Sequence, residues 1–141
     1  MASHHDGAFD IVGRGSDLAI RVRGPDPLAC LAAAVEGLAA SVAEVDPGVE
    51  RRRVPLRLTG DQPADLLVSL LDEAILLLDT EGLLAVGLAD ATLDHGLRGE
   101  LVAVDLDGVV VHGDPPKAAT WHDARLDPVR GRWEGSATVD V

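Results

Sequence analysis

Two aspartates at the ends of predicted strands are the residues best suited to bind a cation. Asp17 begins a segment in which apolar and polar side chains alternate, and Asp140 ends another such segment. Alternation places both carboxylates on the polar faces of their strands. Carboxylate oxygens are the ligands that Ca²⁺, Mg²⁺ and Mn²⁺ prefer. Two such groups can converge at the rim of a sheet, although an aspartate at a strand end is usually only solvated.

Three histidines, His95, His112 and His122, raise the alternative of a zinc site. Their spacing matches no compact zinc pattern, and Cys30 is the single cysteine of the chain. We therefore expect the histidines to be scattered over the surface or along strand edges. Cys30 lies in an alanine-rich helical stretch, where we expect a packed thiol without a reactive role.

Two short stretches carry charged side chains suited to contacts with another protein. Lys117 and His122 bound one of them, and Lys117 is placed either to contact a phosphate or acidic patch or to be solvated. Asp72 and Glu73 form an acidic edge on a predicted helix, which suits a basic partner surface or a solvated face. The chain has no glycine-rich phosphate loop that opens a helix and no recognised nucleophile motif.

Composition narrows the classes of function. The chain has 141 residues and a formal net charge of −12. We expect one domain over residues 1–141, with residues 1–8 flexible. The negative charge disfavours direct binding of nucleic acid, which needs clustered Lys and Arg, and favours a basic partner or a cation. Without an apolar leader, a long apolar span or a cysteine pair, the sequence predicts a cytoplasmic protein with no membrane contact.

Periodicity predicts the elements that hold these residues. One helix begins at Pro27 with Asp26 as its N-cap and ends before Asp46, and a second spans residues 62–79 with Asp61 as its cap. The first helix has alanines opposite its apolar stripe, which predicts cover on more than one side. Alternation predicts strands at residues 9–12, 17–23, 51–58, 84–94, 97–106, 109–112, 118–126 and 132–139.

The order of these elements predicts an α+β fold. Pro55 cannot donate a ladder hydrogen bond, so we expect the strand of residues 51–58 at a sheet edge. Asp107-Gly108 is typical of a tight turn between two strands. Two early helices and a late series of strands predict two helices packed on one face of a mostly antiparallel, meander-rich β-sheet.

Four blocks of the sequence resemble the archease family, in the family's order and at similar spacing. The most specific block runs Lys-Ala-Ala-Thr-Trp-His at residues 117–122 and is similar to the family's Lys-Ala-x-Thr-aromatic-His. The other blocks are the strand at residues 16–24, the helix and following turn at residues 65–82, and residues 138–141, where an apolar strand closes on an aspartate and an aliphatic residue. The resemblance covers most of the chain.

The resemblance implies a function and a site. Archeases are non-enzymatic protein cofactors that promote guanylylation and multiple turnover of RtcB-type RNA ligases in tRNA splicing or RNA repair, and they bind a divalent metal such as Ca²⁺, Mg²⁺ or Mn²⁺. Carried over by position, the implied metal ligands are Asp17, Asp140 and the main-chain carbonyl of Val141. Lys117, His122, Asp72 and Glu73 become candidate contacts to the ligase, and RNA would be met only through that ligase.

The chain departs from the family pattern beside the implied metal site. Arg14 occupies the position of the family's histidine three residues before Asp17, and Trp121 replaces a tyrosine. An Arg14 side chain directed at Asp17 would form a salt bridge when metal is absent. We therefore expect two carboxylates that need a further ligand, supplied by the ligase complex, to hold a metal well.

Two other classes of function remain open. A small metal-dependent phosphohydrolase would use Asp17, Asp140 and His122, although no dense ligand cluster or base–nucleophile pair is evident. A chaperone-like adaptor would act through the acidic surface of the chain.

Overall fold

The computed structural model of the protein describes residues 5–141, without the side chain of Arg14. The described part contains two helices, nine strands and one 3₁₀ turn. In chain order these are β1 (Ala8–Arg14), β2 (Asp17–Gly24), α1 (Pro27–Val42), β3 (Ala43–Val45), β4 (Arg51–Thr59), α2 (Pro63–Glu81), β5 (Leu83–Leu93), β6 (Gly96–Asp105), η1 (Leu106–Gly108), β7 (Val109–Val111), β8 (Ala118–Val129) and β9 (Arg132–Asp140).

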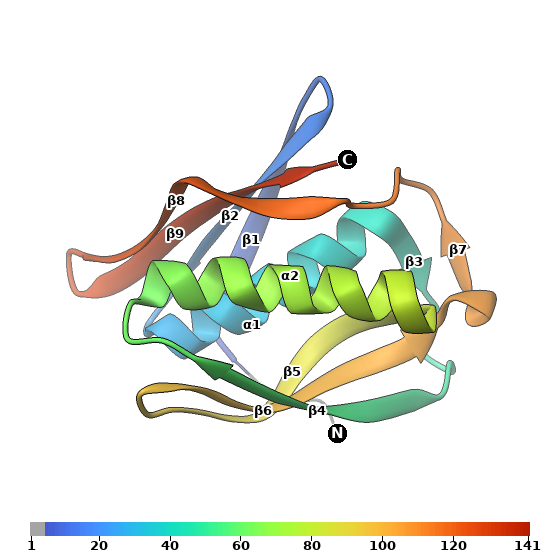
Figure 1. The fold of residues 1–141 in the computed structure, drawn as a ribbon, viewed down its shortest axis with the longest axis horizontal. Coiled ribbons are helices and arrows are strands. Elements are labelled where there is room, and N and C mark those ends of the chain that lie inside the picture. The colour runs from blue at the N-terminus through green and yellow to red at the C-terminus, as the bar shows by residue number, and fades with distance from the viewer. Residues whose placement is uncertain (1–4) are drawn as a thin grey trace.

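The two helices lie between two antiparallel sheets (Figure 1). One sheet has the strand order β1-β2-β9-β8 and the other β4-β6-β5, while β3 and β7 form a separate short ribbon. Helix α1 packs against β1, β2 and β5, and α2 packs mainly against β8 and also against β5. The predicted α+β class with mostly antiparallel strands is confirmed. The helices cover one face of a sheet as expected, but the strands divide among three sheets, and the same two helices serve both large ones.

Helix α1 is buried on nearly all sides, as its alanine-rich sequence predicts. Leu31, Val35 and Leu38 are buried, and so are the alanines between them. Small side chains allow the helix to sit close to both sheets at once. The Asp26 carboxylate accepts a hydrogen bond from the backbone N–H of Ala29 at 2.8 Å, and Pro27 follows in the first turn. This confirms the predicted cap, which typically contributes about 1 kcal/mol to stability.

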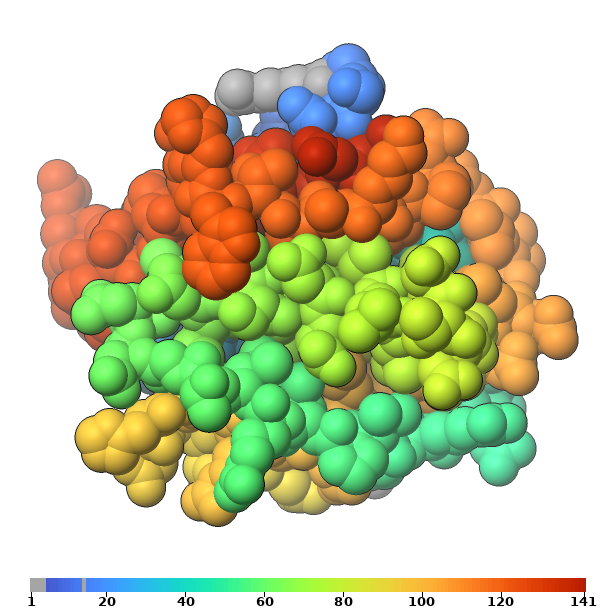
Figure 2. Space-filling model, viewed as in Figure 1, coloured from blue at the N-terminus to red at the C-terminus, as the bar shows by residue number. Residues whose placement is uncertain are grey.

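Helix α2 has a different start from the predicted one. Its N-cap is Gln62, without a side-chain hydrogen bond, so the prediction that Asp61 caps this helix is wrong. The Asp61 carboxylate lies instead 3.6 Å from His95 Nδ1 on the turn between β5 and β6. At the other end, Gly82 adopts the left-handed conformation with φ 66° and closes the helix. One face of α2 stays open to solvent between β8 and β4 (Figure 2).

The connection after β6 is the main local departure from the sequence prediction. Residues Leu106–Gly108 form a 3₁₀ turn, begun by the Asp105 carboxylate accepting from Asp107 N at 3.0 Å. The turn directs β7 away from β6, and β7 pairs instead with β3. The predicted tight turn at Asp107-Gly108 is present between β6 and β7, but these two strands do not pair with each other as a hairpin. Strand β3 escaped prediction because its three residues continue the apolar pattern of α1.

Strand β4 lies at the edge of its sheet, as Pro55 predicts. At the N-terminus, the expected flexibility of residues 1–8 falls, for residues 1–4, outside the described residues. Of the others, the His5 imidazole contacts the Glu36 carboxylate on α1, and Ala8 begins β1. Neither helix in the described part has the long run of apolar residues that crossing a bilayer requires.

Candidate metal-binding site

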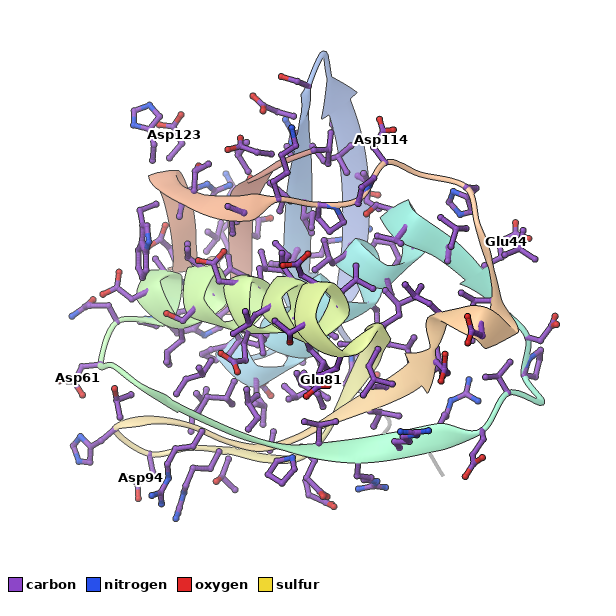
Figure 3. All side chains as sticks on the ribbon, turned by 45° about the vertical axis from the view of Figure 1, so that its right-hand side comes forward. Glu44, Asp61, Glu81, Asp94, Asp114 and Asp123 are labelled. Atoms are coloured by element: carbon purple, nitrogen blue, oxygen red, sulfur yellow. The ribbon has the colours of Figure 1, made fainter. Side chains whose placement is uncertain are left out.

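Asp17 and Asp140 are direct cross-strand partners at one end of the four-stranded sheet. Asp17 follows a two-residue turn in which Gly15 has a φ of +61°, a conformation that glycine adopts without strain. This turn makes Asp17 the first residue of β2, and Asp140 is the last residue of β9. Figure 3 shows the β1–β2 hairpin projecting beyond the body of the molecule. The sequence prediction that the two aspartates meet at a sheet rim agrees with this register.

The two carboxylates lie on the outer, polar face of the sheet. Ile20 and Val22 of β2, and Ala137 and Val139 of β9, are buried on the opposite face toward the helices. Asp17 has the opposite parity along its strand, and so does Asp140. Placement on the polar face, as predicted from alternation, therefore holds for both residues.

The facing carboxylate changes the acidity of Asp17. A hydrogen bond with the Asp140 side chain raises the pKa of Asp17 above its ordinary value, and burial and repulsion between the two negative charges raise it further. Two carboxylates at this separation are stabilised by sharing a proton or by a cation placed between them. The pair therefore has the electrostatic character of a site that gains a positive charge.

Backbone hydrogen bonds fix the two strand ends that carry the pair. Lys117 N donates to Asp140 O at 2.8 Å, and Val141 N donates to Ser16 O at 2.9 Å. Val141 packs its side chain against the main core. Its implied role as a main-chain metal ligand stays a prediction.

A depression of about 340 Å³ opens over the carboxylate pair. The opposed residues Thr120 and Thr138 contribute to its lining, together with His122 and Asp123 from an irregular part of β8. The register of β8 against β9 breaks between Thr120 and Arg125, and Asp123 has a φ of +62°. Figure 3 shows Asp123 pointing away from the body of the molecule. The break brings the side chains of residues 122 and 123 to the rim of the depression.

His122 is at this rim but is not gathered with the carboxylates. Its side chain is 89% exposed, and its Nε2 lies 3.3 Å from the Asp123 carboxylate. The Lys117–His122 block gave a signal for His122 and Thr120 in the sequence, but nothing there indicated Asp123 or Thr138. A strand irregularity of this kind depends on the partner strand, which local sequence does not specify.

The donor set fits a hard cation only in part. Asp17 and Asp140 supply converging carboxylate oxygens, which suit Ca²⁺, Mg²⁺ or Mn²⁺. Within residues 5–141, no group of three or more His, Cys, Asp or Glu side chains is arranged to hold a metal ion. His95 lies on the turn between β5 and β6, and His112 follows β7, both away from this depression. The pair is thus a two-ligand half-site.

The other predicted contact residues occupy a neighbouring surface. The Asp72 carboxylate on α2 accepts a hydrogen bond from Ala119 N at 2.8 Å, so this residue ties the helix to β8. Lys117 and Glu73 are exposed. The predicted pairing of Arg14 with Asp17 falls on a side chain outside the described part, although the two residues are opposite each other in the β1–β2 hairpin. Trp121, 57% exposed, adds an aromatic surface between Lys117 and His122.

Cys30 and a second depression contain reactive residue types, but most of these groups are buried or already have partners. Cys30 is fully buried, and burial raises the pKa of its thiol to about 11, so the thiol stays neutral at physiological pH. This agrees with the prediction of a packed cysteine.

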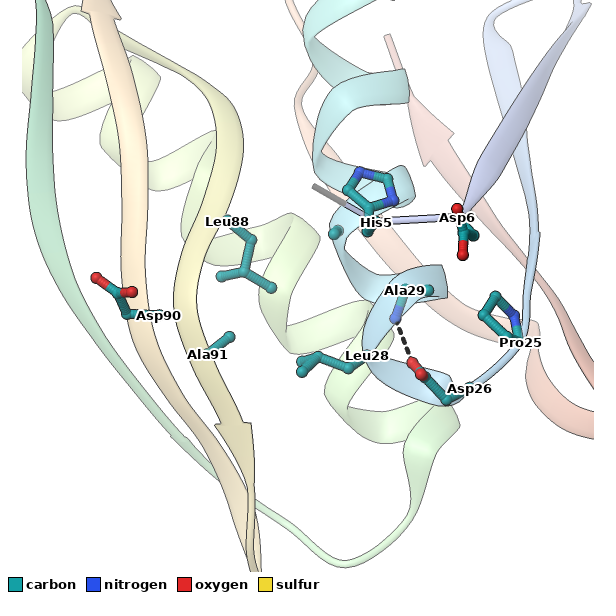
Figure 4. Close-up of a pocket in the computed structure, with 10 residues that line it drawn as sticks. His5, Asp6, Pro25, Asp26, Leu28, Ala29, Leu88, Asp90 and Ala91 are labelled. Carbon is teal, nitrogen blue, oxygen red and sulfur yellow. Dashed lines mark hydrogen bonds between the residues drawn. The ribbon is translucent and has the colours of Figure 1, made fainter. Parts of the chain in front are cut away.

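A depression of about 430 Å³ lies between the N-terminal segment and β5 (Figure 4). Three of the polar residues that line it already have partners: Asp26 caps α1, His5 contacts Glu36, and Asp90 accepts from Arg53.

Comparison with known proteins places the chain in one family. A model of the archease protein family matches residues 9–141. Curated proteins of two Mycobacterium tuberculosis strains, CDC 1551 / Oshkosh and ATCC 25618 / H37Rv, are described as "Probable protein archease". Each is 32% identical over 126 residues, which cover 89% of this chain and 70% of the relative.

Solved structures share the fold. The solution structure of Methanobacterium thermoautotrophicum protein 1598 has a TM-score of 0.70 at 20% identity, covering 95% of this chain and 99% of that chain. The crystal structure of a Thermotoga maritima archease, described as a possible chaperone, has a TM-score of 0.64 at 15% identity, covering 92% and 94%. At these identities the two structures establish the fold alone. The family match and the identity to curated archeases together show that this chain belongs to the archease family.

Proposed function

We propose that this archease is a non-enzymatic protein cofactor of an RtcB-type RNA ligase. It would promote guanylylation and multiple turnover of the ligase in tRNA splicing or RNA repair, and would bind a divalent cation through Asp17 and Asp140. The observation that carries the proposal is the direct cross-strand opposition of these two carboxylates at a sheet end. The membership in the archease family supplies the ligase as the partner.

The carboxylate pair supports cation binding through its own electrostatics. Because Asp140 raises the pKa of Asp17, a cation placed at the pair relieves a repulsion that the folded chain otherwise bears. A bound divalent ion would supply positive charge to neutralise and orient phosphate oxygens. The backbone bonds from Lys117 and Val141 hold the two strand ends in register, so the carboxylates are positioned before any cation arrives.

The same pair favours cation binding within a complex, where another molecule supplies further ligands. Two protein carboxylates leave most positions around a divalent ion to water or to another molecule. A nucleotide phosphate or a ligase side chain could fill those positions when the rim of the sheet meets the ligase. The net charge of −12 favours a basic protein surface as that partner, with RNA reached only through the ligase. One packed cysteine suits the cytoplasm as the compartment.

The test is a reconstituted ligation assay. The ligase from the same genome, GTP, Mn²⁺ and a cleaved RNA are mixed with and without this protein, and ligase guanylylation and rounds of ligation are measured. We expect stimulation by wild type and loss of most stimulation in Asp17→Asn and in Asp140→Asn. Asp127→Asn, an exposed aspartate on β8 outside the depression, is the matched control and should stimulate as wild type does. Absence of stimulation by the wild-type protein would reject the proposal.

Two observations favour alternative functions, one as an enzyme and one as an adaptor. Asp17, Asp140 and His122, the residues that a small metal-dependent phosphohydrolase would use, line one depression. Turnover of a phosphoester by the isolated protein would support that enzyme. The Thermotoga maritima relative is described as a possible chaperone, which favours an adaptor role. Suppressed aggregation of unrelated proteins, without any effect on the ligase, would support the adaptor.

A further inference from the structure

A continuous apolar groove runs along the second half of α2. Two adjoining depressions, of about 300 and 600 Å³, share four lining residues and therefore form one feature. Its floor and walls come from α2 on one side and from residues 111–117 on the other, which lie side by side in Figure 2. We call this feature the α2 groove and define it by Ile75, Leu76, Asp79, Val111, Pro115 and Pro116.

Two of the exposed aliphatic side chains of the described part line the α2 groove. Leu76 is 52% exposed and Val111 is 54% exposed, and both line the groove. Val110, next to Val111 on the short strand β7, is 66% exposed. Isolated exposed apolar residues are ordinary, but neighbouring ones around a depression mark a contact surface.

One wall of the groove is held in place before any partner binds. His112 N and Gly113 N both donate to Val42 O, at 2.9 and 3.2 Å. A Cβ on Gly113 would lie 2.0 Å from the carbonyl oxygen of Ser41, so only glycine allows this close approach. Pro115 and Pro116 then restrict the backbone up to Lys117. A fixed wall lowers the entropy that binding would cost.

Acidic side chains border the apolar surface. Asp72 and Asp79 line the groove along α2, against the single basic residue Lys117. Hydrogen bonding to Ala119 N holds the Asp72 carboxylate at this border. A second copy of this chain would bring another acidic surface to the groove, in a protein of net charge −12, so its occupant is expected to be basic.

We propose that the α2 groove binds a segment of a partner protein in which an aliphatic side chain is flanked by Lys or Arg. The aliphatic group packs against Ile75, Leu76 and Val111, and the basic group meets Asp72 and Asp79. This mode of recognition joins an apolar anchor to a charged rim.

The groove ends at the strand that pairs with Asp140. Lys117 borders the groove and donates its backbone N–H to Asp140 O, and the next residue, Ala118, is the cross-strand partner of Asp140. The start of β8 thus connects the groove to the Asp17–Asp140 site through the backbone. Identifying this partner as the ligase rests on the proposed function, whereas the chemistry of the segment does not.

The first experiment maps peptide binding to the full chain by ¹H–¹⁵N NMR. Three short synthetic peptides are compared: two leucines flanked by lysines, two serines flanked by lysines, and two leucines flanked by glutamates. We expect saturable shifts only with the first peptide, centred on residues 72–79 and 109–117. Shifts elsewhere, or equal shifts with the glutamate peptide, would overturn the proposal.

Matched variants distinguish binding in the groove from nonspecific binding of the peptide. Leu76→Ser and Asp79→Lys should each weaken the lysine–leucine peptide by about fivefold or more. Leu93→Ser removes an exposed leucine, 38% exposed, on the β5–β6 hairpin, and should bind as wild type does. Equal affinity in all variants would overturn the proposal. Concentration-dependent dimerisation abolished by Leu76→Ser would also overturn it, in favour of a second copy as the occupant.

The ligase assay distinguishes failure of the groove from failure of the proposed function. Leu76→Ser should raise the concentration of this protein needed for half-maximal stimulation by about fivefold and leave the maximum unchanged. Stimulation by wild type with no change in Leu76→Ser would reject the groove and leave the proposed function standing. No stimulation by wild type would reject the proposed function, while the peptide mapping still decides the groove.

Discussion

Two groups of charged side chains, one on each large sheet, have opposite kinds of partner. On the three-stranded sheet, the Arg53 guanidinium lies between Asp90, at 2.8 Å, and Glu100, at 3.2 Å. The hydrogen bond to Glu100 is the largest of the contacts that raise the pKa of Arg53. On the four-stranded sheet, Asp17 faces Asp140, and the pKa of Asp17 is raised by a hydrogen bond with the Asp140 side chain, by burial and by the like charge opposite.

This difference distinguishes a contact that stabilises the sheet from one that indicates a binding site. Opposite charges on neighbouring strands stabilise a sheet, and like charges directly across a ladder destabilise it. The fold compensates Arg53 twice, whereas Asp17 facing Asp140 carries an electrostatic cost. Such a cost is expected at sites that bind an ion or act in a reaction. The carboxylate pair is therefore a better candidate site than the equally polar surface around Arg53.

Converting the carboxylate pair into the arginine type of contact gives the largest expected effect. Asp17→Lys places an ammonium opposite Asp140, so the repulsion becomes an attraction. We expect Mn²⁺ binding, measured by isothermal titration calorimetry, to fall below detection and thermal stability to rise. Detectable Mn²⁺ binding with wild-type affinity would show that the cation binds elsewhere.

Removing one negative charge without adding a positive one has a smaller effect on the same measurement. Asp17→Asn should weaken Mn²⁺ binding by at least about tenfold, because one carboxylate ligand is lost. Asp123→Asn, at the rim of the depression, should change affinity less. An equal loss in both variants would move the centre of the site toward the break in β8.

Acid should weaken cation binding by wild type, because protons compete for the same oxygens. Since the pKa of Asp17 is raised, the loss begins at a higher pH than for an ordinary aspartate. Calorimetric titrations with Mn²⁺ across the acid range measure it. An affinity independent of pH would contradict cation binding by this pair.

Without metal, Asp17→Asn should stabilise the fold at neutral pH. A raised pKa means that the folded state favours protonated Asp17, so its contribution is favourable below the ordinary aspartate pKa and is lost as pH rises through the raised value. The variant gains a small increase in Tm at pH 7 that disappears in acid. Thermal melts in EDTA across pH give the comparison, and a constant Tm difference would contradict the shared-proton account.

Arg53→Ala should produce the smallest change. Its contacts with Asp90 and Glu100 are solvent-exposed, and exposed ion pairs contribute little. We expect a slight decrease in Tm relative to wild type, and this difference should become smaller at high salt. Mn²⁺ binding should be unchanged. Loss of Mn²⁺ binding in this variant would break the contrast between the two sheets.

The sequence predicted the elements better than their assembly. Alternation located β2 and β9 and the polar faces of Asp17 and Asp140, because a period of two is a local property. The register that makes these residues opposite joins segments far apart in the chain, and the family resemblance was needed to connect them. Asp61 was a poor guide to the start of α2, because the helix begins one residue later, after Gln62, and the Asp61 carboxylate lies near His95 on a distant turn.

Long-range partners decided the remaining features. The 3₁₀ turn at residues 106–108 and the pairing of β7 with β3 follow from where α1 ends, which no turn motif encodes. The irregularity in β8 that brings Asp123 to the depression depends on β9 in the same way. The α2 groove could not be predicted, since Leu76 looks like any other apolar residue of its helix.

The position of β9 has a consequence for the order in which the protein matures during synthesis. This strand is the last of the described elements to be translated, yet it lies inside its sheet between β2 and β8. While β9 is still within the ribosome, β2 has no partner on that side and Asp17 has no Asp140 opposite. A nascent chain therefore carries a helical and three-stranded part that can form early, and Asp17 and Asp140 come together only after β9 has emerged.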